Sequence, residues 1–518
     1  MTTIRRPRVN IQLVSADVDS ANTPQKILVM GQGVGTSAAA TLYENVTEQA
    51  YEALFAKRSQ MAGMIRMIKR IAPEVQVDAI RIANGAGVPR QVTVAFTGNA
   101  AVNGQFRVIV GSGYDHVYTV DVTTGDTPTI TAAALEALID ADDKCPFTAA
   151  VAVGTVTLTA FTTGLAANTY PVAVQGLVSG QTAVCTQSVA GTVDPTFTAA
   201  LDPAMETRYQ TILWPWAAKT VPGAWASARF NATDIIQDGI VFGYSQDTHA
   251  NLLTEANALN NQSMVVLADL NRAGPGAHIG SSTPERGEVR AAQLAAIRAK
   301  RLTVGASISR YLTTSSSLDQ RGGPALASLP LANTPLPFLP ITPAGFGFTQ
   351  LEIKQLRDAG FYVMGNNPAG TGTLSGEVVT TYKTDPAGNL DPTWKFLPYV
   401  DTASVAREYI DVNLRKRFAQ SRLTLGGVTR GRSSTNDLVF RSYMLKLFGD
   451  LVSMQLAQEG PLALQFFKEN LDIVIDLVVG KVTVDLRLPI VTQLREIDMV
   501  IKIAFGTGTT ELADPAEE

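Results

Sequence analysis

The sequence contains few of the residues that most often do chemistry in enzymes. Its 518 residues include only three histidines and two cysteines. His116, His249 and His278 are far apart, and none lies four residues from a second nitrogen ligand, as the spacing of many zinc sites requires. Cys145 and Cys185 have no histidine nearby to activate a thiol. We therefore expect no catalytic residue, no metal and no cofactor, and a protein that is not an enzyme.

Long apolar runs are also absent. No stretch approaches the roughly 18 consecutive apolar residues that a membrane-spanning helix needs. The first residues carry Arg5, Arg6 and Arg8 and then alternate in polarity, unlike a secretory signal peptide. The sequence thus predicts a protein made in a cytoplasm, where buried free thiols at Cys145 and Cys185 are favoured over a disulfide, although spacing alone leaves both open.

Charge is scarce as well. Charged residues make up 17% of the chain, below the usual quarter, and the formal net charge is -4. Nothing in this balance favours binding to nucleic acid. Much of the polar surface must instead be uncharged, which suits a protein that is partly covered by copies of itself.

One glycine-rich segment raises an enzymatic alternative. Gly31-Gln32-Gly33-Val34-Gly35 follows a predicted strand, and we expect a helix to begin at Thr36, so a phosphate could lie at the helix N-terminus. The third glycine comes one residue too early for a dinucleotide-binding fingerprint, and no acidic residue closes a strand about 20 residues later. A turn with a permissive backbone is the favoured interpretation of Gly31–Gly35, with a dinucleotide-binding enzyme as the alternative.

The two ends of the chain carry the most informative pattern. Apolar residues alternate with polar ones in three segments, which predicts strands with one apolar face. One segment runs from Val482 to Leu488. The predicted inter-subunit strands comprise Val9, Ile11 and Leu13 near the start and Ile497, Met499, Ile501 and Ile503 near the end. Because an unpaired apolar strand recruits another chain, these ends favour assembly.

The interior alternates between helical and strand patterns, which predicts an α/β (α+β) multidomain fold. We expect a helix–strand core formed by N- and C-terminal parts, an inserted mostly-β domain and extended terminal arms. The predicted boundaries are an arm at 1–25, the first core part at 26–88, the β-rich insert at 89–196, the middle core part at 197–400, a C-terminal inner core domain at 401–495, and a terminal strand and arm at 496–518. Within these, we expect helices at 36–43 and 47–72, an extended loop at 322–348 and a strand at 376–382.

A predicted helix near residue 410 is strongly basic. It carries Arg407, Arg415, Lys416 and Arg417, and Arg422 follows it. A solvated helix face is the plain interpretation, and a patch for an acidic partner protein is the functional one. Nucleic acid is disfavoured because no aromatic stripe accompanies the charges.

The order of these segments resembles that of a known family. KILVMGQG followed by YEALFAKRSQMAGMIRMIKRIAPEVQVDAIRIA is similar to the opening of tail sheath proteins of Mu-like contractile-tailed bacteriophages. TAAVAVGTVTLTAFTTGLAANTYPVAV resembles that family's insert domain, and FTQLEIKQLRDAGFYVMGNN with GEVVTTYKTDPAGNLDPTWKFLPYVDTASVAREYIDVNLRKRF fits a later part. The "TTY" strand of the family corresponds here to Thr380, Thr381 and Tyr382. The resemblance covers most of the chain, and the order of segments carries it.

The resemblance implies a structural subunit of a phage virion. Such subunits form stacked hexameric rings around a tail tube and contract to drive the tube through the host envelope. The implied partners are other copies, the tail tube protein, and baseplate and tail terminator proteins, with neither nucleic acid nor membrane insertion. It also implies that terminal arms add strands to a neighbour's sheet. We then expect the insert on the outside of the assembly, and Arg407, Arg415, Lys416 and Arg417 facing the tube. A sheath of a related contractile injection machine (a tailocin) and a surface adhesin are alternatives.

Overall fold

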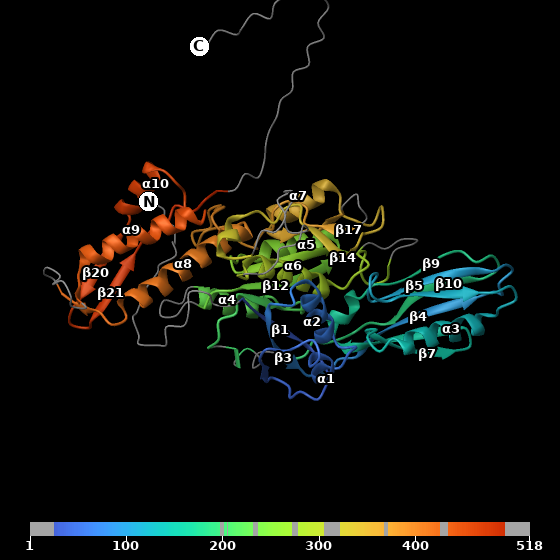
Figure 1. Ribbon diagram of the computed structural model, residues 1–518. Helices are drawn as coiled ribbons and strands as arrows, with labels where there is room; N and C mark the ends of the chain where they lie inside the picture. The colour runs from blue at the N-terminus through green and yellow to red at the C-terminus, as the bar shows by residue number, and fades with distance from the viewer. Residues whose placement is uncertain are drawn as a thin grey trace, which may run out of the picture.

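The computed structural model describes residues 25–196, 201, 203–204, 206–230, 237–271, 278–304, 322–366, 371–424 and 434–492. It is a mixed α/β structure with several sheets, as the sequence predicts. In Figure 1 a β-rich part and a helical part lie at opposite ends of a central sheet. No helix in these residues is long and apolar enough to cross a membrane.

A seven-stranded sheet forms the centre. Its order is β15-β13-β12-β11-β1-β3-β2, and all strands are parallel except the edge strand β2. The strands are β1 (Lys26–Gln32), β2 (Leu42–Tyr43), β3 (Gln76–Ile82), β11 (Thr211–Leu213), β12 (Ile240–Asp247), β13 (Met264–Leu270) and β15 (Phe361–Tyr362). Continuous apolar runs such as that of β1 are typical of parallel strands, which are covered on both faces.

Helices cover both faces of this sheet. Ile27 and Val29 point toward α2 (Gln60–Ile71) and α6 (Gly287–Leu302), whereas Leu28 and Met30 point toward the other face. That second face is covered by three further helices, α4 (Thr220–Phe230), α5 (His249–Ala258) and α7 (Gln350–Asp358). Nearly every residue of α6 is buried, so this helix lies at the centre of the molecule.

The helix predicted over residues 36–43 is wrong. The backbone amides of Thr36 and Ser37 donate to carbonyl oxygens of α1 (Tyr51–Phe55). The following segment ends in β2, which pairs antiparallel with β3. The alanines at 38–40 favour a helix by propensity, but hydrogen bonds to a distant segment outweigh that weak preference.

The helix predicted over residues 47–72 is interrupted. It consists of α1 and α2, separated by a short turn in which Ala56 has a φ of 62°. Ser59 begins α2, because its side chain accepts a hydrogen bond from the amide of Ala62 at 3.0 Å. A serine in this position is a strong helix start signal.

Two smaller sheets and a helix form the β-rich part. One sheet has the order β10-β4-β8-β7 and the other β6-β5-β9. The strands are β4 (Pro89–Thr97), β5 (Gly104–Val110), β6 (Val117–Val122), β7 (Phe147–Ala152), β8 (Thr155–Thr163), β9 (Val172–Gln175) and β10 (Thr182–Val189). The helix is α3 (Pro128–Ala141), and its buried side chains share one core with both sheets. A 3-10 turn, η1 (Leu165–Thr169), connects β8 to β9 and packs against the central sheet through Ala166.

The extended loop predicted over residues 322–348 contains regular structure. It includes the 3-10 turn η3 (Pro324–Ser328) and the strand β14 (Pro335–Pro340). The strand β14 pairs with β17 (Thr371–Thr373), which also pairs with β16 (Gly365–Asn366).

The strand predicted over 376–382 does not form. Val379 makes a single bridge to Phe396, and the two buried threonines that follow bond through their side chains. Thr380 donates to the Trp394 carbonyl at 2.6 Å, and Thr381 to the Asn261 carbonyl at 3.0 Å. Their backbone amides donate to two different segments, Thr380 to the Lys395 carbonyl at 2.8 Å and Thr381 to the Met264 carbonyl at 2.9 Å, so no continuous ladder forms.

The C-terminal part is built around α8 (Leu397–Phe418). The first turns of this helix pack in the core of the central sheet, while Ile410 and Leu414 belong to a separate core. The boundary predicted at 400/401 therefore falls inside one helix. The other elements of this part are β18 (Arg422–Leu423), β19 (Ser434–Thr435), α9 (Asp437–Ser453), α10 (Pro461–Glu469), β20 (Asp472–Asp476) and β21 (Lys481–Asp485).

Candidate assembly surfaces

The hairpin β20–β21 is a two-stranded sheet at the end of the described chain. The strands pair antiparallel, from Asp472 opposite Asp485 to Asp476 opposite Lys481. Ile473 and Val482 lie on the face that packs into the C-terminal core. Within the described residues each strand pairs only with the other. The outer edges therefore present backbone groups to which further strands can bond.

The turn of this hairpin exposes apolar side chains. Val478 is 97% exposed and Val479 is 71% exposed. The Asp476 carboxylate fixes the turn by accepting hydrogen bonds from the backbone amides of both valines, at 2.9 and 3.1 Å. An apolar tip held in a defined shape marks a surface suited to a protein contact.

The predicted strand at Val482–Leu488 is present in shortened form as β21. Val482, Val484 and Leu486 are buried on one face, as their alternation predicts. The strand's partner within the chain, β20, was missed because Asp472–Asp476 has few residues and an acidic end. The predicted inter-subunit residues Val9, Ile11, Leu13, Ile497, Met499, Ile501 and Ile503 lie outside the described residues.

The four predicted tube-facing residues do not share one environment. Arg407 is buried, and its guanidinium donates to the Phe230 carbonyl at 2.9 Å and lies over the Phe230 ring. Arg415 is half-buried and binds Asp411, one turn earlier, at 2.9 and 3.0 Å. Lys416 and Arg417 are exposed in the last turn of α8. The accessible positive charge is thus concentrated at the C-terminal end of this helix.

A buried ion cluster, missed from the sequence, joins this helix to the central sheet. Asp401 in α8 accepts from Arg298 of α6 at 2.6 to 3.1 Å, and Arg301 lies 3.4 Å away. Arg298 also donates to the Gln210 carbonyl at 2.8 Å and to the Thr211 hydroxyl at 2.7 Å. Nothing in the local sequence of either helix indicates that these charged side chains meet in the interior.

The glycine segment at 31–35 is packed against protein. A Cβ atom at Gly35 would lie 2.0 Å from the carbonyl oxygen of Leu54, and one at Gly33 would lie 3.0 Å from that of Phe55. These glycines allow close approach to the carbonyl end of α1, whose partial negative charge repels a phosphate. The glycines serve this close packing rather than a left-handed backbone, since none of the three has a positive φ, and the helix predicted directly after them does not form.

The usual ligand position of an open parallel sheet is also filled. Ligands bind beyond the carboxyl ends of the strands where the strand order reverses, here between β1 and β11. Gln32, at the end of β1, donates to the Thr163 carbonyl at 3.0 Å. After β11, Trp214 and Trp216 are buried and pack edge to face in one cluster with Ala166 of η1. The connection between β8 and β9 thus occupies this crevice, which disfavours the dinucleotide-binding alternative.

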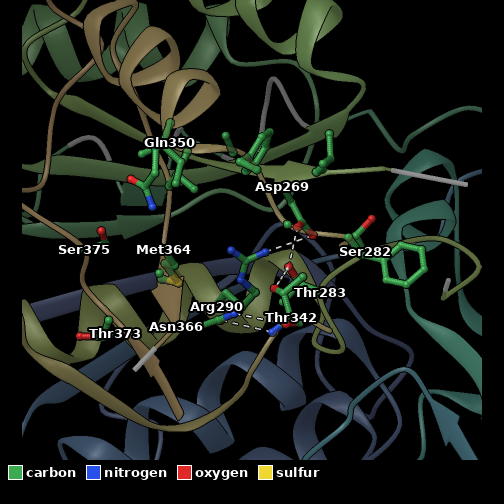
Figure 2. Close-up of a pocket in the computed structure, with 18 of the residues that line it drawn as sticks. Asp269, Ser282, Thr283, Arg290, Thr342, Gln350, Met364, Asn366, Thr373 and Ser375 are labelled. Atoms are coloured by element: carbon green, nitrogen blue, oxygen red, sulfur yellow. Dashed lines mark hydrogen bonds and ion pairs between the residues drawn. The ribbon is translucent and has the colours of Figure 1, made fainter. Parts of the chain in front are cut away.

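A cavity of about 570 Å³ lies beyond β13 and β15, and Figure 2 shows its lining. Its charged groups neutralise each other, because Arg290 lies 3.1 Å from Asp269. The Thr283 hydroxyl donates to Asp269 at 2.7 Å, and the Asn366 amide donates to the Thr342 carbonyl at 3.2 Å. These groups are arranged as a structural network, and no nucleophile–base pair is among them.

The histidines and cysteines also have structural surroundings. The Nδ1 atom of His116 lies 2.8 Å from the Asp142 carboxylate, and burial lowers the pKa of this histidine. Both cysteines are free thiols, as favoured above. Burial raises the pKa of Cys145, and it raises that of Cys185 to about 12, so neither is a reactive thiolate. In the described part of the chain, no group of three or more His, Cys, Asp or Glu side chains could hold a metal ion.

Comparisons with known proteins support the resemblance seen in the sequence. No family model matches the chain. The chain is 26% identical over 260 residues to the Mu-like prophage FluMu tail sheath protein of Haemophilus influenzae, a match that covers 47% of this chain and 51% of that protein. The chain thus spans about half the length of the curated relative it matches. The resemblance to tail sheath proteins of Mu-like phages is confirmed by this match.

Solved structures give weaker likenesses. A sheath tail protein of Desulfitobacterium hafniense has a TM-score of 0.44 at 12% identity, with 90% of this chain and 92% of that chain covered. One of Listeria innocua has a TM-score of 0.46 at 12% identity, with 92% and 94% covered. The helical sheath of the anti-feeding prophage in its contracted state has a TM-score of 0.42 at 9% identity, with 97% of each chain covered.

Proposed function

We propose that this chain is the subunit of a contractile tail sheath, a structural protein that polymerises as stacked hexameric rings around a tail tube. The sequence match to a tail sheath protein supports the class. The single structural observation that carries the proposal is the hairpin β20–β21, a two-stranded sheet whose outer edges are unpaired within the described residues. An isolated two-stranded sheet is marginally stable and gains from added strands.

The terminal segments are the proposed source of those strands. The alternating residues at 9–13 and 497–503 have the period that a strand with one buried face requires. Backbone hydrogen bonds between strands are directional and tolerate many sequences, so such a joint can stay closed while subunits rotate. Contraction would then be driven by better packing in the shorter state, with no nucleotide consumed.

The proposed orientation follows from the two ends of the molecule. The β-rich part and the helical part with the basic end of α8 lie at opposite ends in Figure 1. We place Lys416 and Arg417, with Arg415 beside them, on the tube side, and the insert on the outside. Arg407 has a buried structural role in this arrangement. The partners would be other copies, the tail tube protein, and baseplate and tail terminator proteins, within a phage virion.

Point substitutions in the C-terminal arm test the proposal. The alternation predicts that Ile501 faces the neighbour's sheet, whereas Lys502 faces the opposite way. We expect Ile501→Asp to leave a folded chain that no longer forms tubes or rings in electron micrographs, because a charge would be buried between strands. Lys502→Asp, the matched control, should still assemble.

Truncation gives an independent test. Chains lacking residues 1–20 or 495–518 should keep the circular dichroism spectrum of the full chain and fail to polymerise. Full-length tubes formed by either truncated chain would reject the strand-exchange proposal. The truncated chains of a tailocin sheath should also fail to polymerise, so this test does not separate a phage sheath from a tailocin sheath. The genes beside this one would distinguish these two kinds of assembly.

A further inference from the structure

One face of α10 leaves large apolar side chains uncovered. Leu462 is 80% exposed, and Phe466, one turn later, is 41% exposed. On the adjoining face Ala463 and Phe467 are buried, and the Phe467 ring stacks on that of Phe448 in α9 with 4.6 Å between the ring centres. The helix thus packs through one apolar face and presents a second one to solvent. Leu462 and Phe466 are called the exposed pair of α10 below.

The C-terminal end of the described chain lies beside the start of this helix. The Gln458 amide donates to the Pro489 carbonyl at 2.8 Å. The Val491 amide donates to the Leu456 carbonyl at 3.3 Å. The Gln458 side-chain amide also donates to the Thr492 hydroxyl at 3.4 Å. Since α10 begins three residues after Gln458, these contacts bring the end of the described chain close to the exposed pair.

The next apolar residues of the chain are within reach of the exposed pair. The alternating set begins at Ile497, five residues after Thr492, and an extended chain covers up to about 17 Å over that distance. The whole of α10, with nine residues, is about 14 Å long. The set offers large apolar side chains with no charge among them, at Ile497, Met499, Ile501 and Ile503. Its members can therefore cover the exposed pair without burying an unpaired charge.

We propose that in the unassembled subunit these four residues cover the exposed pair of α10 in their own chain, and so hold the C-terminal arm back from its neighbours. The tether favours this occupant, because a segment attached a few residues away has an effective concentration in the millimolar range, far above that of other subunits before assembly. The inference rests on the proposed function, in which the same apolar face joins a neighbour's sheet. Since one face cannot make both contacts, α10 competes with the neighbour and delays polymerisation.

Cross-linking of the full chain tests the contact. Gln465 is exposed beside the pair, and Val500 lies within the arm, so cysteines at both positions leave the apolar residues in place. In a Cys185→Ala background, at a concentration where sedimentation shows single subunits, Gln465→Cys with Val500→Cys should be linked within one chain by a short bis-maleimide. Leu438→Cys with Val500→Cys should give at least fivefold less, because Leu438, 71% exposed, lies at the start of α9, away from the end of the described chain.

Loss of the exposed pair distinguishes this contact from ordinary packing. Leu462→Ser with Phe466→Ser should lower the yield of the intramolecular cross-link at least fivefold. The same change should shorten the lag before tube formation, followed by light scattering, at least threefold. A released arm explains faster assembly, whereas loss of a packing contact or of a contact between subunits would slow it. Leu438→Ser, which removes a large exposed side chain from α9, should change neither value.

Three outcomes would overturn the contact. The first is no intramolecular product, or an equal yield from Gln465→Cys and Leu438→Cys. The second is a product with the mass of two chains, which would assign the exposed pair to the arm of another copy. The third is an unchanged or longer lag in the variant without the pair. Electron microscopy judges the proposed function separately, because a chain that gives the cross-link but no tubes rejects only the sheath, and tubes without the cross-link reject only this contact.

Discussion

Asp401 is the residue on which the attachment of the C-terminal part most depends. Its carboxylate is fully buried between two arginines of α6. One of them, Arg298, also donates a hydrogen bond to the Gln210 carbonyl, directly before β11. Buried charges of this kind stabilise a structure only when each has its partner, and removal of one partner costs about 3–5 kcal/mol. The cluster therefore fixes α8 to the central sheet through buried, charge-assisted hydrogen bonds.

Substitution of Asp401 should lower the free energy of unfolding. Asp401→Asn would leave two buried guanidinium groups short of charge compensation, and we expect a loss of about 3 kcal/mol in urea unfolding followed by circular dichroism. Asp411→Asn in the same helix is the matched control, because its half-buried pair with Arg415 is worth only about 0.5 kcal/mol. Equal losses for the two variants would contradict the role given to Asp401.

At this scale the sequence indicates local features better than partnerships. The free thiols were favoured from the usual behaviour of buried cysteines, although the spacing left a disulfide open. The Arg298–Asp401 pair could not be foreseen, since its members are more than a hundred positions apart and each looks like an ordinary surface charge. Arg407 shows the same limit, because nothing in its own segment indicates that Phe230 covers it.

The last turn of α8 is the element that carries accessible positive charge. Lys416 and Arg417 are exposed there. Positive side chains are favoured at the C-terminal end of a helix, because the helix dipole is negative there. Lys416→Glu with Arg417→Glu should therefore leave folding unchanged and lower co-sedimentation with purified tail tubes at least tenfold. Lys446→Glu with Lys468→Glu, at exposed positions of α9 and α10, changes the net charge equally and should bind as the unaltered chain does. Equal binding by both double variants would remove α8 from the tube side.

Elements were predictable where one periodicity ran without interruption, as in β1 and β21. A strand was wrongly predicted where consecutive residues have backbone partners in different segments. Thr380 and Thr381 have the composition of a strand, yet the amide of Thr380 donates to the Lys395 carbonyl and that of Thr381 to the Met264 carbonyl, so no continuous ladder forms. Such contacts depend on segments brought together only by the fold, so no local pattern could have indicated them.

At the scale of the whole molecule, the β-rich part is joined to the core by more than its two chain connections. Val172 and Ile279 exchange backbone hydrogen bonds of 2.9 and 2.8 Å. The Ser112 hydroxyl donates to the buried Glu285 carboxyl at 2.5 Å, and Arg286 lies over the Tyr170 ring. The joint between the two parts is thus a buried polar interface, and its strength depends on the protonation of Glu285.

Burial raises the pKa of Glu285 from 4.5 to about 7, against the opposing effect of Arg286. A carboxyl with a raised pKa in the folded state contributes stability that is full below pH 4.5 and is lost as the pH rises to about 7. Glu288, whose pKa burial also raises, acts in the same direction, and His116, whose pKa burial lowers, acts in the opposite one. Asp115 and Arg70 form an ion pair of 3.0 Å nearby. The joint should therefore open more readily at pH 8 than at pH 5.

Hydrogen exchange measures this opening directly. After correction for the intrinsic effect of pH, we expect amides in 112–116 and 279–286 to lose protection at least tenfold between pH 5 and pH 8, while β1 keeps its protection. Glu285→Gln keeps the hydrogen-bonding shape and cannot ionise, so it should remove most of this pH dependence. If the variant kept the full dependence, the titrating group would be elsewhere in the joint, and Glu285 would be only a packing residue.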